Sequence, residues 1–276
     1  MRLAGEHDSF LDRWIIACSL IVVVLLIAPL LVAAVNSLGD GVLAVFPPEH
    51  FASDAYRSIP RQWWEAIATS AAVSFAASLI AVMFGTLGAW GLVRGRVRAS
   101  LRTVVEVILR SPVQVPALVS GVSFMLLYVW LRDRTEWDAL ANGVGLVVAH
   151  AAYTLPFVLA IVGARLASFD TTLEDAAMGL GASRTETFLR VTLPVLWPAI
   201  MMGGLFSFLI SFDNLPLSLF MVNAGIRLFP VELFNGITFE VTRVIYAVAT
   251  IVAVATSLIV LATFRYLRSV VVHDNG

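Results

Sequence analysis

The sequence predicts an all-α integral membrane protein with about six transmembrane helices. The chain has 276 residues, of which 59% are hydrophobic and only 13% are charged, and its mean hydropathy is +0.90. A soluble domain carries about 25% charged residues, so this chain has too few charges to cover a surface that faces water. Residues 14–35 contain no charged side chain, and about 20 apolar residues suffice to cross the hydrocarbon core of a bilayer.

Six apolar segments define the predicted spans, all within one transmembrane domain over residues 1–276. They cover residues 14–35, 67–93, 105–131, 143–165, 199–222 and 244–267. Because further spans follow the first, we interpret residues 14–35 as a retained helix rather than a cleaved signal peptide. Pro112 and Pro116 lie near the start of the third span, where they are expected to bend it.

The arginines in the short loops predict the orientation of these spans. The loops on one side hold 11 arginines, four of them between residues 94 and 102, and the loops on the other side hold six. Positively charged loop residues collect on the cytoplasmic side of a membrane protein. We therefore expect both termini and the loop 166–198 to lie in the cytoplasm.

The residue types exclude several classes of function. The 18 residues counted as Lys or Arg are all arginines, so the chain contains no lysine. A Walker A loop needs a lysine that contacts the nucleotide phosphates. Any ATP-driven work therefore requires an ATPase on another chain. The net charge of −1 indicates no affinity for nucleic acid. A single cysteine, Cys18, excludes a cysteine-rich metal site. We expect no catalytic residue, metal or cofactor, because HExxH, GxSxG and paired catalytic carboxylates are absent from the sequence.

The loop 166–198 is predicted to form two short helices around a tight turn. The residue pairs with capping-box spacing are Thr171 with Glu174 and Ser183 with Glu186. Gly181 lies between these pairs, where it can end the first helix in a left-handed turn. Pro194 is expected to end the second helix before the fifth span begins.

The first of these helices has a narrow apolar face, formed by Leu173, Ala176, Ala177 and Leu180. This spacing is typical of one side of a helix. Small alanines in its middle would let another protein approach the backbone closely. Two alternatives remain open from the residues themselves: docking onto a separate protein, or packing against the membrane or the chain's own spans.

The same loop resembles the EAA motif of permease subunits of bacterial ABC importers. The matching pattern is Asp175-Ala176-Ala177, three residues, Gly181, nine residues, and Val191-Thr192-Leu193-Pro194. Members of that family usually have Glu where this chain has Asp175, and Ile where it has Val191. The residues that the resemblance assigns to ATPase coupling are Glu174, Asp175, Ala176, Ala177, Gly181, Val191, Leu193 and Pro194.

The resemblance implies a type I ABC importer permease fold in a bacterial inner membrane. In that family the loop forms a coupling helix that sits in a groove of an ATPase dimer, and a periplasmic binding protein delivers the substrate. The segments 207–216 and 228–234 resemble the spermidine/putrescine branch, which commonly pairs two different permease chains. A polyamine is therefore the expected substrate, with another small solute of the iron, thiamine, amino acid or phosphonate type as the alternative.

Four polar residues are candidates for the substrate path. Asp213 and Asn214 lie in the fifth span before Pro216, and an ionisable residue at membrane depth usually faces a cavity or a partner. His150 and Tyr153 lie in the fourth span. The alternatives are a hydrated Asp213 at the interface and a His150 that packs through hydrogen bonds. A self-sufficient secondary transporter is a further alternative, but it would need more intramembrane charges than Asp213.

Overall fold

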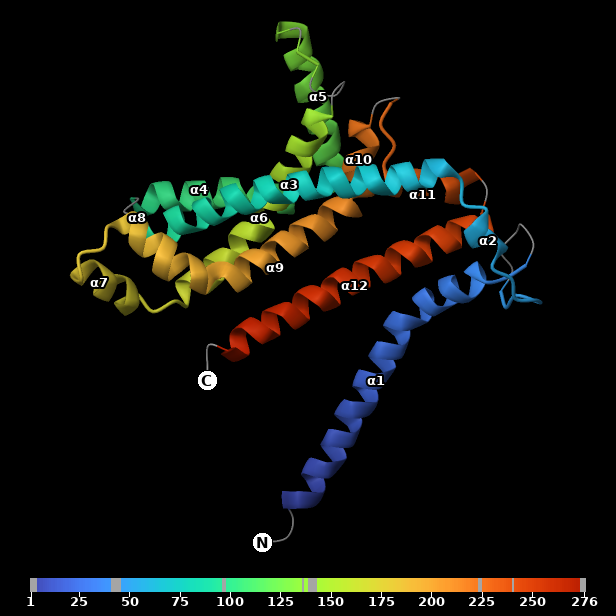
Figure 1. The fold of residues 1–276 in the computed structure, drawn as a ribbon, viewed down its shortest axis with the longest axis horizontal. Coiled ribbons are helices and arrows are strands. Elements are labelled where there is room, and N and C mark those ends of the chain that lie inside the picture. The colour runs from blue at the N-terminus through green and yellow to red at the C-terminus, as the bar shows by residue number, and fades with distance from the viewer. Residues whose placement is uncertain are drawn as a thin grey trace. The chain divides into compact units, whose positions relative to one another are not determined.

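The structure is a computed structural model that describes residues 4–40, 46–95, 98–135, 137–138, 143–222, 225–239 and 241–273. The described residues form helices and contain no β-strand (Figure 1). The helices are α1 (Ala4–Ser37), α2 (Asp54–Arg57), α3 (Arg61–Arg94), α4 (Ala99–Gln114), α5 (Ala117–Thr135), α6 (Val144–Ala167), α7 (Thr172–Gly179), α8 (Arg184–Thr187), a π-helical turn (Phe188–Thr192), α9 (Leu193–Phe212), α10 (Leu215–Met221), α11 (Phe229–Phe239) and α12 (Arg243–His273).

The predicted all-α membrane fold is confirmed. Within the described ranges, five helices are long and apolar enough to cross a bilayer, namely Asp12–Ser37, Arg61–Arg94, Val144–Ala167, Arg184–Phe212 and Arg243–Ser269. About 20 residues of helix are about 30 Å long, which matches the hydrocarbon core. The chain is therefore a multi-pass membrane protein.

The structure divides the predicted third span, 105–131, between α4 and α5. α4 continues through Pro112 and ends at Gln114, and Val115 has an extended backbone with ψ 128°. A residue that precedes proline avoids the helical region, so the break falls at Val115 because Pro116 follows it. α5 has 19 residues but carries three charged residues, Arg132–Arg134, at its end, which leaves only a shorter uncharged stretch.

The chain forms two compact units, Met1–Pro60 with Asn235–Ser257, and Arg61–Phe234 with Leu258–Gly276. In the first unit, Arg243 is buried and its Nη1 donates to the carbonyl oxygen of Asn36 at 3.1 Å. The hydroxyl groups of Ser37 and Tyr56 are hydrogen-bonded at 2.7 Å in the same unit. The single domain predicted over residues 1–276 stays a prediction.

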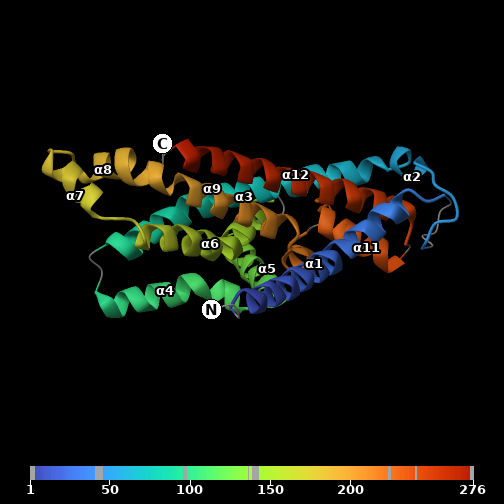
Figure 2. The ribbon, with the colours of Figure 1, turned by 90° about the horizontal axis from the view of Figure 1, so that it is seen from below.

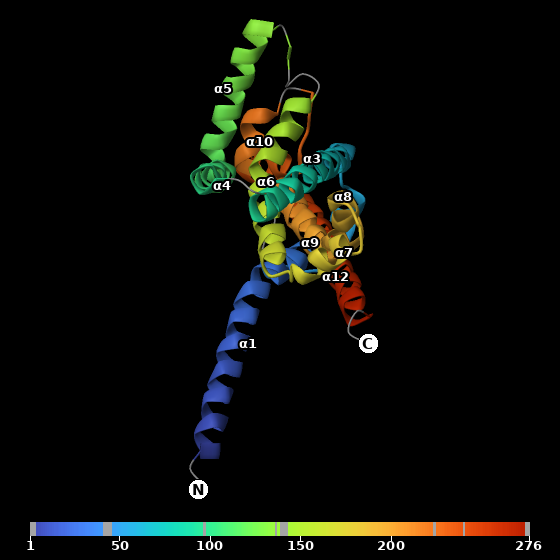
Figure 3. The same cartoon turned by 90° about the vertical axis from the view of Figure 1, so that its left-hand side faces the viewer.

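The second unit has its main core where α3, α6 and α9 pack along one another (Figures 1 and 2). The fully buried residues of this core come from all three helices and include Ala81, Val158, Val162, Leu166 and Leu196. A second cluster joins α5, α6 and α10, and α5 lies beside α10 in Figure 3. The serines of α3 at positions 70, 74 and 78 are buried, as their four-residue spacing predicts for close helix packing.

Close contact between α3 and α6 depends on Gly85. A Cβ atom at Gly85 would lie 2.9 Å from the Cβ of Val158, whereas one at Gly91 of the same helix would meet nothing within 4 Å. We expect Gly85→Ala to destabilise the protein by about 1–3 kcal/mol, because the helices must move apart. Gly91→Ala is the matched control and should not lower the melting temperature in detergent. Equal melting temperatures for the two variants would contradict this packing.

Candidate functional site

Helix α7 begins without the predicted Thr171–Glu174 capping box, so that prediction was wrong. The Thr171 side chain makes no capping hydrogen bond. Instead, Oδ1 of Asp170 accepts a hydrogen bond from the backbone N–H of Thr172 at 3.0 Å. Hydrogen bonds from Thr172 lower the pKa of the Asp170 carboxyl group, because they stabilise its charged form. The carboxylate of Glu174 contacts Arg94 and Thr192 instead.

The predicted left-handed turn at Gly181 is confirmed. Gly181 has φ +94°, and its N–H donates to the carbonyl oxygen of Met178 at 3.0 Å. The N–H of Ala182 donates to the carbonyl oxygen of Ala177 at 3.1 Å, which completes a Schellman motif. A Cβ atom at Gly181 would meet nothing within 4 Å. Glycine is therefore required here for its backbone conformation, not for lack of space.

The predicted capping box of Ser183 and Glu186 is also confirmed. The N–H of Glu186 donates to Oγ of Ser183 at 3.3 Å, and the N–H of Ser183 donates to Oε2 of Glu186 at 2.9 Å. Together with the turn at Gly181, these two hydrogen bonds fix the direction in which α8 follows α7.

The apolar face of α7 is exposed in the described part of the chain. Leu180 is 92% exposed and Leu173 is 51% exposed. Asp175 and Ala176 are also exposed, and Ala177 is half-buried. The described residues therefore leave this face uncovered, which argues against packing onto the chain's own spans and favours contact with something outside the chain.

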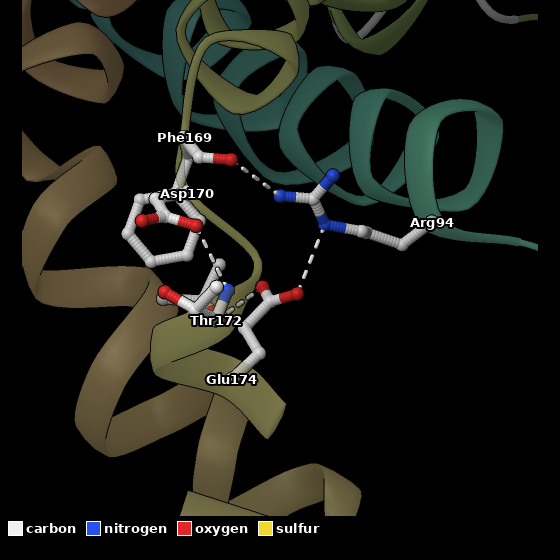
Figure 4. A network of polar contacts seen from close by, with 6 residues as sticks. Arg94, Phe169, Asp170, Thr172 and Glu174 are labelled. Atoms are coloured by element: carbon white, nitrogen blue, oxygen red, sulfur yellow. Dashed lines mark hydrogen bonds and ion pairs between the residues drawn. The ribbon is translucent and has the colours of Figure 1, made fainter. Parts of the chain in front are cut away.

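The opposite side of α7 is attached to the bundle through Glu174. Its Oε2 lies 3.0 Å from Nε of Arg94 at the end of α3, and its Oε1 accepts a hydrogen bond from Oγ1 of Thr192 at 2.8 Å. Nη2 of Arg94 also donates to the carbonyl oxygen of Phe169 at 3.3 Å (Figure 4). The side chains of Arg94 and Glu174 are only 18% and 13% exposed. Glu174 was predicted as an ATPase-coupling residue, but its carboxylate contacts its own chain.

The helix continues through Pro194, so the predicted end there was wrong. α8, the π-helical turn Phe188–Thr192 and α9 follow one another without a break. In the wider turn, the N–H of Leu193 donates to the carbonyl oxygen of Phe188, five residues earlier. This turn shifts the hydrogen-bond register just before a proline that has no N–H to donate. Leu193 packs against the α3–α6–α9 core, Val191 is half-buried and Pro194 is exposed.

A second break in helical structure separates α9 from α10 at Asp213 and Asn214. Asp213 ends α9, and the Oδ1 of Asn214 accepts a hydrogen bond from the N–H of Leu217 at 3.1 Å. Asp213 is exposed and Asn214 is buried. Both line a cleft of about 420 Å³ together with Tyr153 and Pro216. The structure thus brings three of the four predicted path residues together, with Asn214 also capping α10.

His150 is buried beside this break and contacts both of its flanks. Its Nδ1 lies 2.9 Å from Oγ of Ser211 in α9, and its Nε2 lies 3.4 Å from Oγ of Ser218 in α10. The Ser218 hydroxyl also donates to the carbonyl oxygen of Asn214 at 2.6 Å, so it connects His150 to the residue that caps α10. His150 does not line the cleft, and its contacts are those with the two serines; its place on the substrate path stays a prediction.

Sequence reasoning missed Arg94 and the serines that contact His150. Arg94 lies at the end of an apolar segment, where an arginine side chain usually extends to the membrane surface. The sequence therefore gives no sign that Arg94 pairs with Glu174. Ser211 and Ser218 are seven residues apart, which is two helical turns, but the helix break between them hides their common target. The described residues contain no group of three or more His, Cys, Asp or Glu side chains placed to hold a metal ion.

Comparison with known proteins identifies the family. Residues 81–271 match the family described as binding-protein-dependent transport system inner membrane component. The chain is 31% identical over 195 residues to the putrescine transport system permease protein PotI of Escherichia coli K12, covering 70% of this chain and 69% of that protein. It is 30% identical over 194 residues to the spermidine/putrescine permease PotC of Haemophilus influenzae, covering 70% and 72%.

A solved structure agrees with this assignment at the level of the fold. The crystal structure of a bacterial ABC transporter involved in the import of the acidic polysaccharide alginate has a chain that matches with a TM-score of 0.71 and 14% identity. The match covers 98% of this chain and 99% of that one. The helices, the matched family and the relatives together establish that the chain belongs to the permease subunits of binding-protein-dependent ABC importers.

Proposed function

We propose that this permease subunit forms half of the translocation path for a polyamine and is coupled to a separate ATPase through α7. The observation that carries the coupling is the uncovered apolar face of α7, with Leu180 92% exposed. The chain has no lysine and so cannot form a Walker A loop of its own. An ATPase dimer is therefore the proposed partner of this face.

The proposed substrate follows from the relatives and from the charge beside the cleft. The relatives PotI and PotC are named as permeases for putrescine and spermidine. Asp213 brings a carboxylate to the cleft of about 420 Å³, and Tyr153 adds an aromatic ring. A carboxylate attracts a cationic amine electrostatically, and an aromatic face adds a cation–π contribution. An anionic solute would be repelled at the same place.

The complete importer needs partners beyond the ATPase. We propose a second permease, different from this chain, to complete the path, and a periplasmic binding protein to deliver the polyamine. A neighbour with the same fold was crystallised with an alginate pentasaccharide-bound periplasmic protein. In this arrangement both termini and α7 lie on the cytoplasmic side of the bacterial inner membrane, as the arginine distribution predicts.

Uptake by cells that lack this chain tests the proposal. We expect uptake of radiolabelled putrescine and spermidine to fall to background and to return with the wild-type gene, while sulfate uptake stays unchanged as the control. The affinity-purified chain should bring an ATPase subunit with it. Unchanged polyamine uptake would contradict the substrate, and uptake that survives removal of every ATPase partner would instead support a secondary transporter.

A further inference from the structure

Glu174 is the one residue of α7 whose carboxylate joins two separate parts of the described bundle. Its Oε2 pairs with Arg94 at the end of α3 at 3.0 Å, and its Oε1 is bonded by Thr192, in the turn that precedes α9, at 2.8 Å. Each carboxylate oxygen thus holds a different helix. Hydrogen bonds and ion pairs that involve a charged group are the strong ones among side-chain contacts.

The burial of this contact separates it from ordinary surface ion pairs. Arg94 and Glu174 are 18% and 13% exposed, and Thr192 is 1% exposed. In contrast, Arg102 and Glu106 are 47% and 34% exposed and join neighbouring turns of α4. Exposed pairs contribute little to stability, whereas removing one partner of a shielded pair leaves a charge without compensation.

The end of α3 also holds the chain on both sides of α7. Before α7, the Arg94 guanidinium donates to the Phe169 carbonyl and lies 5.9 Å from the centre of the Phe169 ring. After α7, the indole of Trp90 packs edge to face against Phe188, with ring centroids 5.2 Å apart. α7 is therefore attached to α3 before, within and after its own length (Figure 4 shows the first two attachments).

These attachments have a mechanical consequence. α3 packs closely along α6 and α9, where Gly85 leaves no room for a Cβ atom against Val158. A force on the exposed face of α7 must therefore move α3 and α9 with it, provided that the contact at Glu174 stays intact. Without that contact, α7 could shift on its connections while the bundle stays in place.

We propose that Arg94, Glu174 and Thr192 are positioning residues that transmit the motion of α7 to the α3–α6–α9 bundle. This inference rests on the proposed function, in which a separate ATPase moves α7. It assigns Glu174 to the inner side of α7 as the link to the bundle, and leaves the outer face to the ATPase. Packed helices shift between discrete arrangements, so a rigid link passes a displacement on rather than absorbing it.

Glu174→Gln and Arg94→Gln test this link in the reconstituted importer. Each should reduce uptake by about tenfold, while the complex still copurifies and hydrolyses ATP at its basal rate. The double variant should lose no more than either single variant, because both remove one shared contact. Arg102→Gln, which breaks the exposed pair with Glu106, is the matched control and should transport like the wild type.

Chemical cross-linking separates a link from a general folding role. Because Cys18 is the single cysteine, Arg94→Cys and Glu174→Cys can be combined in a Cys18→Ser background. Uptake should be low in the uncross-linked protein and should recover when a short bifunctional thiol reagent joins the two positions. Wild-type uptake in both Gln variants, or no recovery after cross-linking, would overturn the inference. If the proposed function itself were wrong, the result would differ, because no ATPase would copurify with the wild-type chain.

Discussion

Leu180→Asp is expected to release the ATPase from the permease and to abolish polyamine uptake. Leu180 is 92% exposed, so its replacement removes almost none of the chain's own packing. In the proposed complex the side chain is buried against the ATPase, and an unpaired carboxylate there should weaken binding by about 100-fold or more. Copurification of the ATPase and uptake of labelled putrescine measure the two effects.

A matched control separates this effect from a simple change of charge. Thr135→Asp adds the same charge at an exposed position at the end of α5, and it should leave both copurification and uptake unchanged. If α7 instead lay on the membrane surface, Leu180→Asp would reduce membrane contact but not the amount of copurified ATPase. Full copurification with the Leu180 variant would therefore contradict the docking of this face.

Asp213→Asn should reduce uptake of putrescine by about tenfold or more, because the cleft loses the carboxylate that faces the cation. The variant should remain folded, since Asp213 is exposed and ends α9 rather than packing in a core. Asp213→Glu keeps the charge and should retain more uptake than Asp213→Asn. Uptake at several substrate concentrations would show whether apparent affinity or maximal rate has changed.

Asp133→Asn is the matched control for the loss of one carboxylate. Asp133 is 64% exposed and pairs with Arg132 at 3.6 Å near the end of α5. An exposed pair of this kind contributes little, so uptake should not change. If Asp213→Asn transports as well as Asp133→Asn does, Asp213 is a hydrated residue at the membrane interface and not part of the path.

The features that sequence reasoning predicted correctly around α7 depend on neighbours in the chain. A left-handed glycine and a capping box each involve contacts within a few residues, and both Gly181 and the Ser183–Glu186 pair formed as expected. The break at Val115 has the same local origin, because Pro116 restricts the residue before it. The sequence predicted only a bend within the third span, whereas the structure has a complete break there between α4 and α5.

The predictions that failed concern residues with a choice of partners. Glu174 has the spacing for a cap, which is worth about 1 kcal/mol. The structure offers it an ion pair with a shielded arginine and a hydrogen bond from a buried hydroxyl group instead, and a hydrogen bond to a charged group is by itself worth about 1.5–3 kcal/mol. Pro194 was expected to end a helix, but the preceding π-helical turn lets the helix continue.

By itself, the sequence determined the membrane class, the position of α7 and the turn that follows it, because composition and local hydrogen bonding decide these features. Only the tertiary structure decided that Glu174 binds Arg94, that His150 joins the two sides of the α9–α10 break, and that Asp213 meets Tyr153 at one cleft. Those contacts join residues far apart in the chain. They exist because the packing of α3, α6 and α9 brings together side chains that the sequence keeps apart.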